Sequence, residues 1–361
     1  MHVLVVNAGS SSLKLSVIGD GQETIASLEL GDPAEQAVVD SMLAFVAQHP
    51  DLGAAGHRIV HGGPHLTDAV VVDDHVRAQM DAAATIAPLH DPPALRMLDA
   101  LRAMNLTHVA CFDTGFHASM PDSARTYAIP GEWRERFGIR RYGFHGLSCA
   151  WSLRRASELL GRPAQDLQLI VAHLGAGASA TAIRGGHSVD TSMGFTPLEG
   201  LVMATRSGSV DPGALLWLQT VGGIGAGEMS RALEHESGTL GLTGTADMRA
   251  ILAEAADGHP AAALARDVYV HRAAAVIAGL ATSLRRIDAV VFTGGVGENA
   301  AEVRTAICAR LGILGVAPPD RVLPPATDGP VSAPDARTAI LVIRAREDLQ
   351  IDHEVRRLLA S

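Results

Sequence analysis

The chain has 361 residues, of which 47% are hydrophobic and 19% are charged. This composition is typical of a globular protein, and the length is enough for two domains with separate cores. A formal net charge of −10 argues against broad binding to nucleic acids or anionic membranes. The three cysteines, Cys111, Cys149 and Cys308, are widely spaced and suggest neither a disulfide framework nor a zinc site. Because the start also lacks a signal peptide pattern, we expect a cytoplasmic protein.

The first element expected is a hairpin over residues 1–18, in which the turn NAGSSS separates two apolar runs. Backbone N–H groups in a glycine turn form a concavity that can bind an anion, and phosphate is the expected ligand. Lys14 is the only lysine among the 29 lysine and arginine residues. A compact point charge at this turn suits a phosphate better than a planar guanidinium does. An ordinary hairpin is the alternative, since a single G-x-G is a weak signal.

The first half continues with helical patterns and one informative strand. Residues 34–49 have apolar residues at helical spacing, and Pro92-Pro93 leads into a helix over 94–104. A strand over 107–112 ends directly before Asp113. Because α/β folds hold catalytic or metal-binding groups just past the ends of strands, Asp113 is a candidate for such a role. A simple Asx-turn residue is the alternative.

The hairpin pattern occurs again after a helix expected over 146–160. Apolar runs flank the turn HLGAG at 173–177, and an ungapped alignment places Asn7 on His173 and Gly9 on Gly175. A phosphate turn used twice predicts two related domains, and one nucleotide bound by both turns indicates a kinase or an ATPase.

The remaining chain shows a third glycine-rich turn. A strand over 287–292 runs into TGGVGEN and a helix to about 311, an arrangement that can cradle a nucleotide at a helix N-terminus. The other expected elements are helices at 212–221, 226–235, 244–256, 266–286 and 348–359, a strand at 339–343 and a surface excursion at 315–338.

Ten sequence blocks, in one order, resemble the acetate kinase family along nearly the whole chain. They are VNAGSSSLK (6–14), GHRIVHGG (56–63), APLHDP (87–92), FDTGFH (112–117), IRRYGFHG (139–146), HLGAGAS (173–179), SVDTSMGFTPLEGL (188–201), TRSGSVDP (205–212), FTGGVGEN (292–299) and RAREDLQI (344–351). The resemblance implies an α/β fold of two duplicated RNase H-like domains around a nucleotide cleft, as in actin, sugar kinases and heat-shock ATPases. It places residues 1–148 in the first domain, with the helix 348–361 packing back on it, and 149–347 in the second.

The same resemblance assigns roles to individual residues. The catalytic residues would be Asp113, His145, Arg206 and Arg58, with His145 and Arg206 stabilising the transition state. The acyl substrate would meet Arg58, His90, Val60, Leu89, Phe144 and Pro197. The nucleotide and its phosphates would be bound by Ser10, Ser12, Lys14, His173, Leu174, Gly175, Ala176, Gly177, Asp247, Met248, Arg249, Gly295, Val296 and Asn299. A magnesium ion would be held by Asn7, Asp113 and Glu347.

The expected function is reversible, direct in-line transfer of the ATP γ-phosphoryl group to acetate, with Mg²⁺ (Mn²⁺ also possible). A carboxylate is ionised at neutral pH, so the reaction needs cations that neutralise charge rather than a general base. The resemblance also suggests a homodimer, and neither nucleic acid nor membrane is an expected partner. Open alternatives are a propionate or butyrate kinase, a different phosphoryl donor such as pyrophosphate, and a non-catalytic actin-like nucleotide-binding protein.

The chain departs from the family pattern at three positions and in length. The family usually has His at Cys149, Asn at Ala176, and Asp or Asn at Ser209, and it has a longer region around 19–55. The Ala176 departure lies in the second phosphate turn, so the identity and affinity of the phosphoryl donor stay open.

Overall fold

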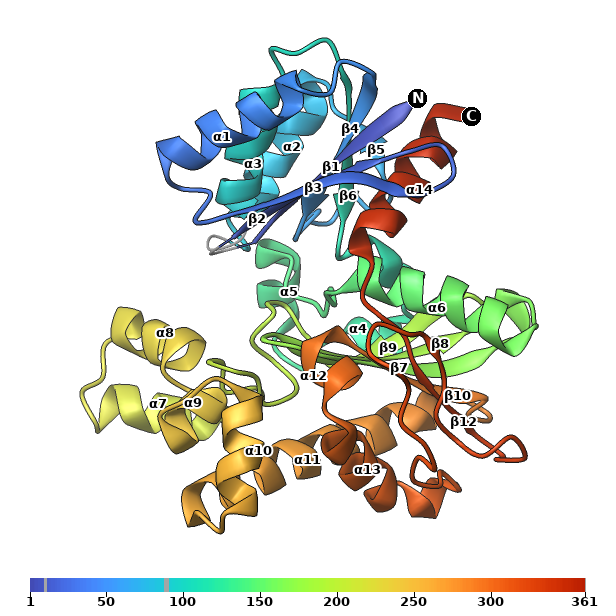
Figure 1. Ribbon diagram of the computed structural model, residues 1–361. Coiled ribbons are helices and arrows are strands. Elements are labelled where there is room, and N and C mark those ends of the chain that lie inside the picture. Colours follow the sequence, from blue (N-terminus) through green and yellow to red (C-terminus); the bar gives the residue numbers. More distant parts are fainter. Residues whose placement is uncertain (10–11, 88–90, 361) are drawn as a thin grey trace. The chain divides into compact units, whose positions relative to one another are not determined.

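The computed structural model describes residues 1–9, 12–87 and 91–360. The chain divides into two compact units (Figure 1). The first comprises Met1–Ala118, Phe144–Trp151 and the chain from Arg346 onward, and the second Ser119–Gly143 and Ser152–Ala345. Each unit contains one six-stranded sheet.

The sheet of the first unit has the order β3-β2-β1-β4-β6-β5. Strands β1, β2 and β3 are antiparallel, β4 and β6 continue parallel to β1, and β5 pairs antiparallel at the edge. The bounds are β1 (His2–Ala8), β2 (Leu13–Ile18), β3 (Thr24–Leu30), β4 (Leu52–Ile59), β5 (Val70–Val71) and β6 (Thr107–Phe112).

Apolar residues alternate along the central strands, so both faces of this sheet carry buried side chains. In β1, Leu4 and Val6 face a core covered by α1 (Gln36–Ala47), α2 (Asp74–Ala84) and α3 (Asp91–Leu101), whereas Val3 and Val5 face α14 (Glu347–Ala360) (Figure 1). Gly56 on β4 permits this second contact, because a Cβ there would lie 2.5 Å from Cγ2 of Ile351. The C-terminal helix therefore packs closely on the central strands, and its first residues reach the end of β4.

The second sheet, β11-β12-β10-β7-β8-β9, repeats the first strand for strand. Its antiparallel trio is β7, β8 and β9, its parallel strands are β10 and β12, and β11 is the antiparallel edge. Asn7 and His173 are each the next-to-last residue of the first strand of their hairpin. The predicted duplication and fold class are thus confirmed. The bounds are β7 (Gln168–Leu174), β8 (Ala178–Arg184), β9 (His187–Thr191), β10 (Ala289–Thr293), β11 (Gly329–Pro330) and β12 (Ala339–Val342).

The helices predicted outside the first unit are present with shifted ends, whereas the short helices Asp122–Arg125, Gly131–Phe137 and Gly238–Thr243 were not predicted. The predicted helix 244–256 begins only at Met248, because Gly244 ends the preceding helix in a left-handed conformation and Asp247 caps the next one. The long helix predicted at 266–286 runs over Pro260–Leu280, with proline in its first turn. The helices are α4 (Asp122–Arg125), α5 (Gly131–Phe137), α7 (Pro212–Thr220), α8 (Ala226–His235), α9 (Gly238–Thr243), α10 (Met248–Ala256), α11 (Pro260–Leu280), α12 (Gly294–Asn299) and α13 (Ala301–Arg310), while α6 (Gly146–Leu160) continues from the first unit into the second.

Short 3-10 turns at Gly115–His117, Ala164–Asp166, Ala281–Ser283 and Gly312–Leu314 complete the regular structure. No helix within the described residues has the length and apolar character needed to cross a membrane.

Candidate active site

Four predicted site residues meet in the first unit, at one end of its sheet. Arg58 near the end of β4 donates from Nη2 and Nε to Oδ2 of Asp113, at 2.6 and 3.1 Å. Its Nη1 donates to Oδ1 of Asn7 on β1, at 3.1 Å. Asn7 in turn donates from Nδ2 to Oε2 of Glu347, at 3.0 Å, at the start of α14. Parallel strands ending at one edge, together with the docked α14, bring these distant residues together.

The cluster holds more negative than positive charge. Asp113 is 1% exposed, and Glu347 lies 3.8 Å from Nε of Arg58. Burial and the charge of Glu347 raise the pKa of Asp113, while Arg58 opposes the shift. For Arg58, burial lowers the pKa, but Asp113 and Glu347 outweigh it and raise the pKa above its usual value. Two carboxylates against one guanidinium leave a net negative site that favours a cation.

One atom of this cluster lacks a partner. Asp113 Oδ1 is buried and has no hydrogen-bond partner among the described residues. Those residues include no group of three or more His, Cys, Asp or Glu side chains arranged to hold a metal. Mg²⁺ needs no such group, because it is commonly bound by one or two carboxylates, substrate phosphates and water. The donor set of Asp113, Glu347 and Asn7 therefore fits a magnesium ion.

The loop after Arg58 is held by Asp91, which the sequence reading did not assign. Asp91 Oδ1 accepts the backbone N–H groups of Val60 and His61, both at 3.1 Å. Burial raises the pKa of Asp91 to about 7, against the opposing effect of these two hydrogen bonds. Val60 is itself buried. In the sequence, the position of Asp91 before Pro92-Pro93 indicates a helix start, but it does not indicate that Asp91 binds the loop after Arg58.

A second backbone segment converges on Asp113. Gly146 donates its N–H to the carbonyl of Asp113 at 3.0 Å, and a Cβ at Gly146 would clash with that carbonyl. The preceding His145 has φ of +56°, a left-handed conformation that is strained for a side-chain residue. His117 Nε2 donates to the carbonyl of Phe144 at 2.9 Å, and burial lowers the pKa of His117 to about 4. A neutral buried histidine thus fixes the segment that carries His145.

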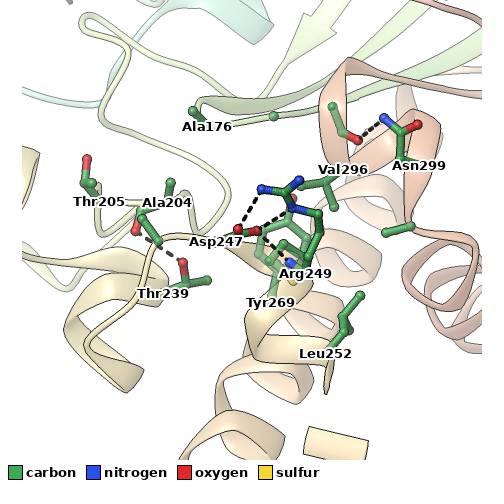
Figure 2. Close-up of a pocket in the computed structure, with 15 residues that line it drawn as sticks. Ala176, Ala204, Thr205, Thr239, Asp247, Arg249, Leu252, Tyr269, Val296 and Asn299 are labelled. Carbon is green, nitrogen blue, oxygen red and sulfur yellow. Dashed lines mark hydrogen bonds and ion pairs between the residues drawn. The ribbon is translucent and has the colours of Figure 1, made fainter. Parts of the chain in front are cut away.

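The second unit contains a cavity of about 920 Å³, a size common for small-molecule sites (Figure 2). The phosphate turn after β7, the N-terminus of α10 and the glycine turn after β10 all contribute to its wall. Eight predicted nucleotide residues line it: Gly175, Ala176, Asp247, Met248, Arg249, Gly295, Val296 and Asn299. The sequence did not identify seven further lining residues, of which only Thr205 lies in one of the quoted family motifs: Ala204, Thr205, Thr239, Ala246, Leu252, Tyr269 and Ala300.

Hydrogen bonds fix the wall of this cavity. Asp247 caps α10 and forms a two-pronged ion pair with Arg249, whose side chain is 91% exposed (Figure 2). Asn299 donates from Nδ2 to the carbonyl of Gly295 at 2.8 Å. The carbonyl of Ala176 accepts the N–H of Ala204 at 3.0 Å, which ties the second phosphate turn to the following segment.

The glycine turn after β10 packs against the second phosphate turn. A Cβ at Gly294 would lie 3.1 Å from Nε2 of His173 and 2.8 Å from the carbonyl of Leu174. Gly175 also donates its N–H to the carbonyl of Gly177 at 2.9 Å, closing that turn. His173, Leu174 and Gly177 thus lie beside the cavity without forming its wall.

The remaining predicted residues lie apart from these two clusters or form other pairs. Arg206 in the second unit pairs with Glu234 at 3.3 Å and donates to the carbonyl of the buried Pro197 at 3.4 Å. Glu234 was missed because nothing in α8 marks it as a site residue. Lys14, opposite Asn7 on β2, pairs with Glu29 at 3.4 Å. Ser12 accepts the N–H of Gly9 at its carbonyl. Ser10, Leu89 and His90 lie outside the described residues.

The three departures have different surroundings. Cys149 is fully buried in α6, and Ser209 accepts the N–H of Gly200 at its hydroxyl. Ala176 is exposed on the wall of the cavity. Only the Ala176 departure therefore changes the surface that a ligand in this cavity would meet.

This chain has two six-stranded sheets with the same topology and glycine turns at the strand ends. This arrangement is the actin-like α/β fold. Within that class, the model described as "Acetokinase family" matches residues 25–353. The chain is 42% identical to an acetate kinase of Streptomyces avermitilis, with 100% of this chain and 98% of that protein covered. The chain belongs to the acetokinase family.

The folds of two solved structures match the fold of this chain over nearly its full length. The acetate kinase of Porphyromonas gingivalis superposes with a TM-score of 0.89 at 30% identity, covering 99% of each chain. A propionate kinase from Francisella tularensis reaches 0.88 at 33% identity, covering 98% of each chain.

Proposed function

We propose that this protein catalyses reversible, Mg²⁺-dependent transfer of the γ-phosphoryl group of ATP to acetate, giving acetyl phosphate and ADP. Family membership supports the reaction class. The observation that carries the proposal is the Arg58–Asp113–Glu347 cluster, which combines an anion-binding guanidinium with a carboxylate atom left open for a cation. A protein that only bound nucleotide would not need this combination.

In the first unit, Arg58 is the proposed ligand of the acetate carboxylate. Its two hydrogen bonds to Asp113 fix the plane of the guanidinium, so it is oriented before the substrate binds. Asp113 and Glu347, with Asn7 beside them, would hold the metal, which when bound neutralises phosphate charge. Ser10, Ser12 and Lys14 would add donors on the phosphate side, and the strained His145 would contact the transferring phosphoryl group.

In the second unit, the cavity is the proposed nucleotide site. Backbone N–H groups near Gly175 and Gly295 would face the phosphates, because glycine turns at strand ends and helix N-termini favour anions. Asp247, Arg249 and Asn299 would contact the nucleoside, and His173 would lie at its phosphate end. Arg206 would stabilise the charge that develops on transfer, and its ion pair with Glu234 would orient the guanidinium.

In the first unit, Val60 and Phe144 would line the pocket for the acyl chain. Both side chains are buried, which supports an apolar lining for a short acyl chain. The likeness to a propionate kinase keeps propionate as a second substrate. Val60→Ala should raise the propionate-to-acetate ratio of kcat/KM, since one methylene in an apolar pocket is worth about 1–3 kcal/mol. An unchanged ratio of kcat/KM for propionate and acetate would show that Val60 does not line the pocket.

The activity is tested by trapping acetyl phosphate as the hydroxamate in the presence of acetate, ATP and Mg²⁺. A panel of propionate, butyrate and pyrophosphate identifies the preferred acid and donor. Arg206→Ala should lower kcat by roughly a hundredfold or more with the fold intact, because its charge acts mainly in the transition state. Arg231→Ala, an exposed arginine on α8, is the matched control. No turnover of any acid by the wild type would favour the non-catalytic alternative.

A homodimer is the proposed assembly. The helix α7 has no buried residue, and Leu216, Trp217 and the adjacent Val221 are each at least 58% exposed. Such a group of large apolar side chains is typical of an interaction surface. Trp217→Glu should shift the mass measured by light scattering from dimer to monomer, and a monomeric wild type would contradict the proposal.

A further inference from the structure

A second hollow in the second unit is lined by arginines. It has a volume of about 640 Å³, and its charged lining includes Arg162, Arg184, Arg285 and Arg286. It lies where β7 and β10 begin, whereas the nucleotide cavity lies where both strands end. A seven-residue strand separates the two places by about 20 Å. The hollow is therefore distinct from the nucleotide cavity.

The sheet pairing explains why these arginines gather. Gln168 opens β7 and is paired in register with Arg184 at the end of β8. Asp288, just before β10, donates its N–H to the carbonyl of Gln168 at 2.8 Å. The segment before β7, the end of β8 and the segment before β10 are thus joined at one edge of the sheet.

A largely buried layer beneath the arginines holds them in place. The Asp288 carboxylate, 10% exposed, accepts hydrogen bonds from Nη1 of Arg162 at 3.0 Å and from Nε of Arg286 at 2.8 Å. It also accepts the N–H of Gln168 at 2.8 Å. The buried Gln168 side chain accepts the backbone N–H of Arg285 at 2.8 Å. Supporting polar groups of this kind preorganise a binding site.

The hollow carries excess positive charge. The lining has four arginines and one carboxylate, Asp166, and the Asp288 carboxylate pairs with two of these arginines, in a protein whose net charge is −10. Arg184 donates to the neutral carbonyl of Ser283, and no side-chain hydrogen bond or ion pair of Arg285 is found in the described part of the chain. Two guanidinium groups therefore remain without an acidic partner. Their forked donors match phosphate oxygens well.

We propose that this arginine hollow is a second anion site, which binds a small anion carrying two or more adjacent negatively charged groups, of the diphosphate class. A single carboxylate or phosphate offers one anionic group to the two guanidinium groups that have no acidic partner. A diphosphate would offer two such groups, one for each guanidinium.

Calorimetric titration with inorganic pyrophosphate tests the site, with saturating ADP present to occupy the nucleotide cavity. The variant Arg184→Ala/Arg285→Ala removes the two arginines without acidic partners and leaves the partners of Asp288 unchanged. We expect at least tenfold weaker binding in this variant and steep weakening of the wild-type interaction with added salt. Arg231→Ala removes an exposed arginine elsewhere and should bind as the wild type does.

Inorganic phosphate, titrated in parallel, should bind much more weakly than pyrophosphate. Binding that is equal for the two anions would overturn the diphosphate assignment. An isotherm unchanged in the double variant, or weakened equally in Arg231→Ala, would overturn the site itself. Thermal unfolding of each variant checks the fold, and Arg285→Gln, which keeps the length and polarity of the side chain, repeats the test if the double variant is unstable.

Discussion

Arg304 on α13 is expected to control nucleotide affinity without touching the nucleotide. The side chain is 3% exposed, and Nη1 donates to the carbonyls of Gly297 and Glu298 at 2.8 and 2.9 Å. Both carbonyls lie near the end of α12, a six-residue helix whose final carbonyls have no partner within the helix. Glu298 holds the other end, because Oε1 accepts the N–H of Gly294 at 3.0 Å. Hydrogen bonds thus fix both ends of the short helix α12, which lines the proposed nucleotide cavity.

Arg304→Met keeps an apolar stem of similar length and removes the donor to two carbonyl acceptors, one buried and one partly buried. Each such acceptor costs about 1–3 kcal/mol. Relief of burying a charge offsets part of this, since burial lowers the pKa of Arg304. The net cost of Arg304→Met is then about 2–4 kcal/mol. Part of this cost lowers the free energy of unfolding, and the rest weakens nucleotide binding. If about 1.4 kcal/mol appears in binding, the KM for ATP rises tenfold.

Steady-state kinetics with both substrates, and thermal unfolding, measure the outcome for Arg304→Met. The KM for acetate should stay within twofold, because Arg58 lies in the other unit and shares no described contact with Arg304. Arg304→Lys should recover part of the ATP affinity through one of the two hydrogen bonds. An ATP KM that stays constant while the melting temperature falls would show that Arg304 only stabilises the fold. Equal rises in both Michaelis constants would also refute the reasoning.

Three further predictions concern the phosphoryl donor, the metal and pH. Ala176→Asn adds an amide on the cavity wall, so the KM for ATP should fall roughly tenfold with the KM for acetate unchanged; an ATP KM that rises indicates a site shaped for another donor. Asp113→Asn should raise the Mg²⁺ concentration needed for half-maximal activity, and an unaltered Mg²⁺ curve would exclude Asp113 as a ligand. Burial, and then the charge of His108, lowers the pKa of His57 from 6.5 to about 3. His57 stays neutral in the fold while the unfolded chain takes up a proton below about pH 6.5, so this stability is complete above that pH and is lost as pH falls towards 3. The free energy of unfolding, measured with urea at pH 7.5 and 5, should therefore change less with pH in His57→Gln than in the wild type. His49→Gln is the control and should behave as the wild type does. An equal change in His57→Gln and the wild type would show that His57 is not the group responsible.

Local patterns determined the parts of the fold that short segments decide by themselves. Both hairpins were predicted because alternating apolar residues flank turns that only glycine-rich sequence forms readily. The strand before Asp113 and the helix that ends before Gly161 were also predicted from local patterns, an apolar run and a glycine at a helix end. Helix ends moved by several residues where a side-chain cap decided them, as Asp247 does for α10. The ordered family motifs then indicated the duplicated fold and the family, and both were confirmed.

Some strands were missed because their sequences look unlike strands. The segment around Arg58 contains Gly56 and two polar residues, and it is nevertheless β4, a central strand of the first sheet. Its glycine is explained only by the close approach of α14, more than 290 residues later in the chain. Burial between helix layers, which no local pattern encodes, makes this segment a strand.

The tertiary structure decided which charged groups meet. Asn7 and Glu347 are 340 residues apart, and their hydrogen bond exists because α14 docks on the sheet beside β1. The pairing of Arg206 with Glu234, the support given by Arg304 and the gathering of arginines before β7 and β10 arise in the same way. A sequence pattern can name the residue types that suit phosphate chemistry, since those types follow from charge and hydrogen bonding. The partners of each residue, and therefore its pKa and orientation, depend on distances that only the folded chain sets.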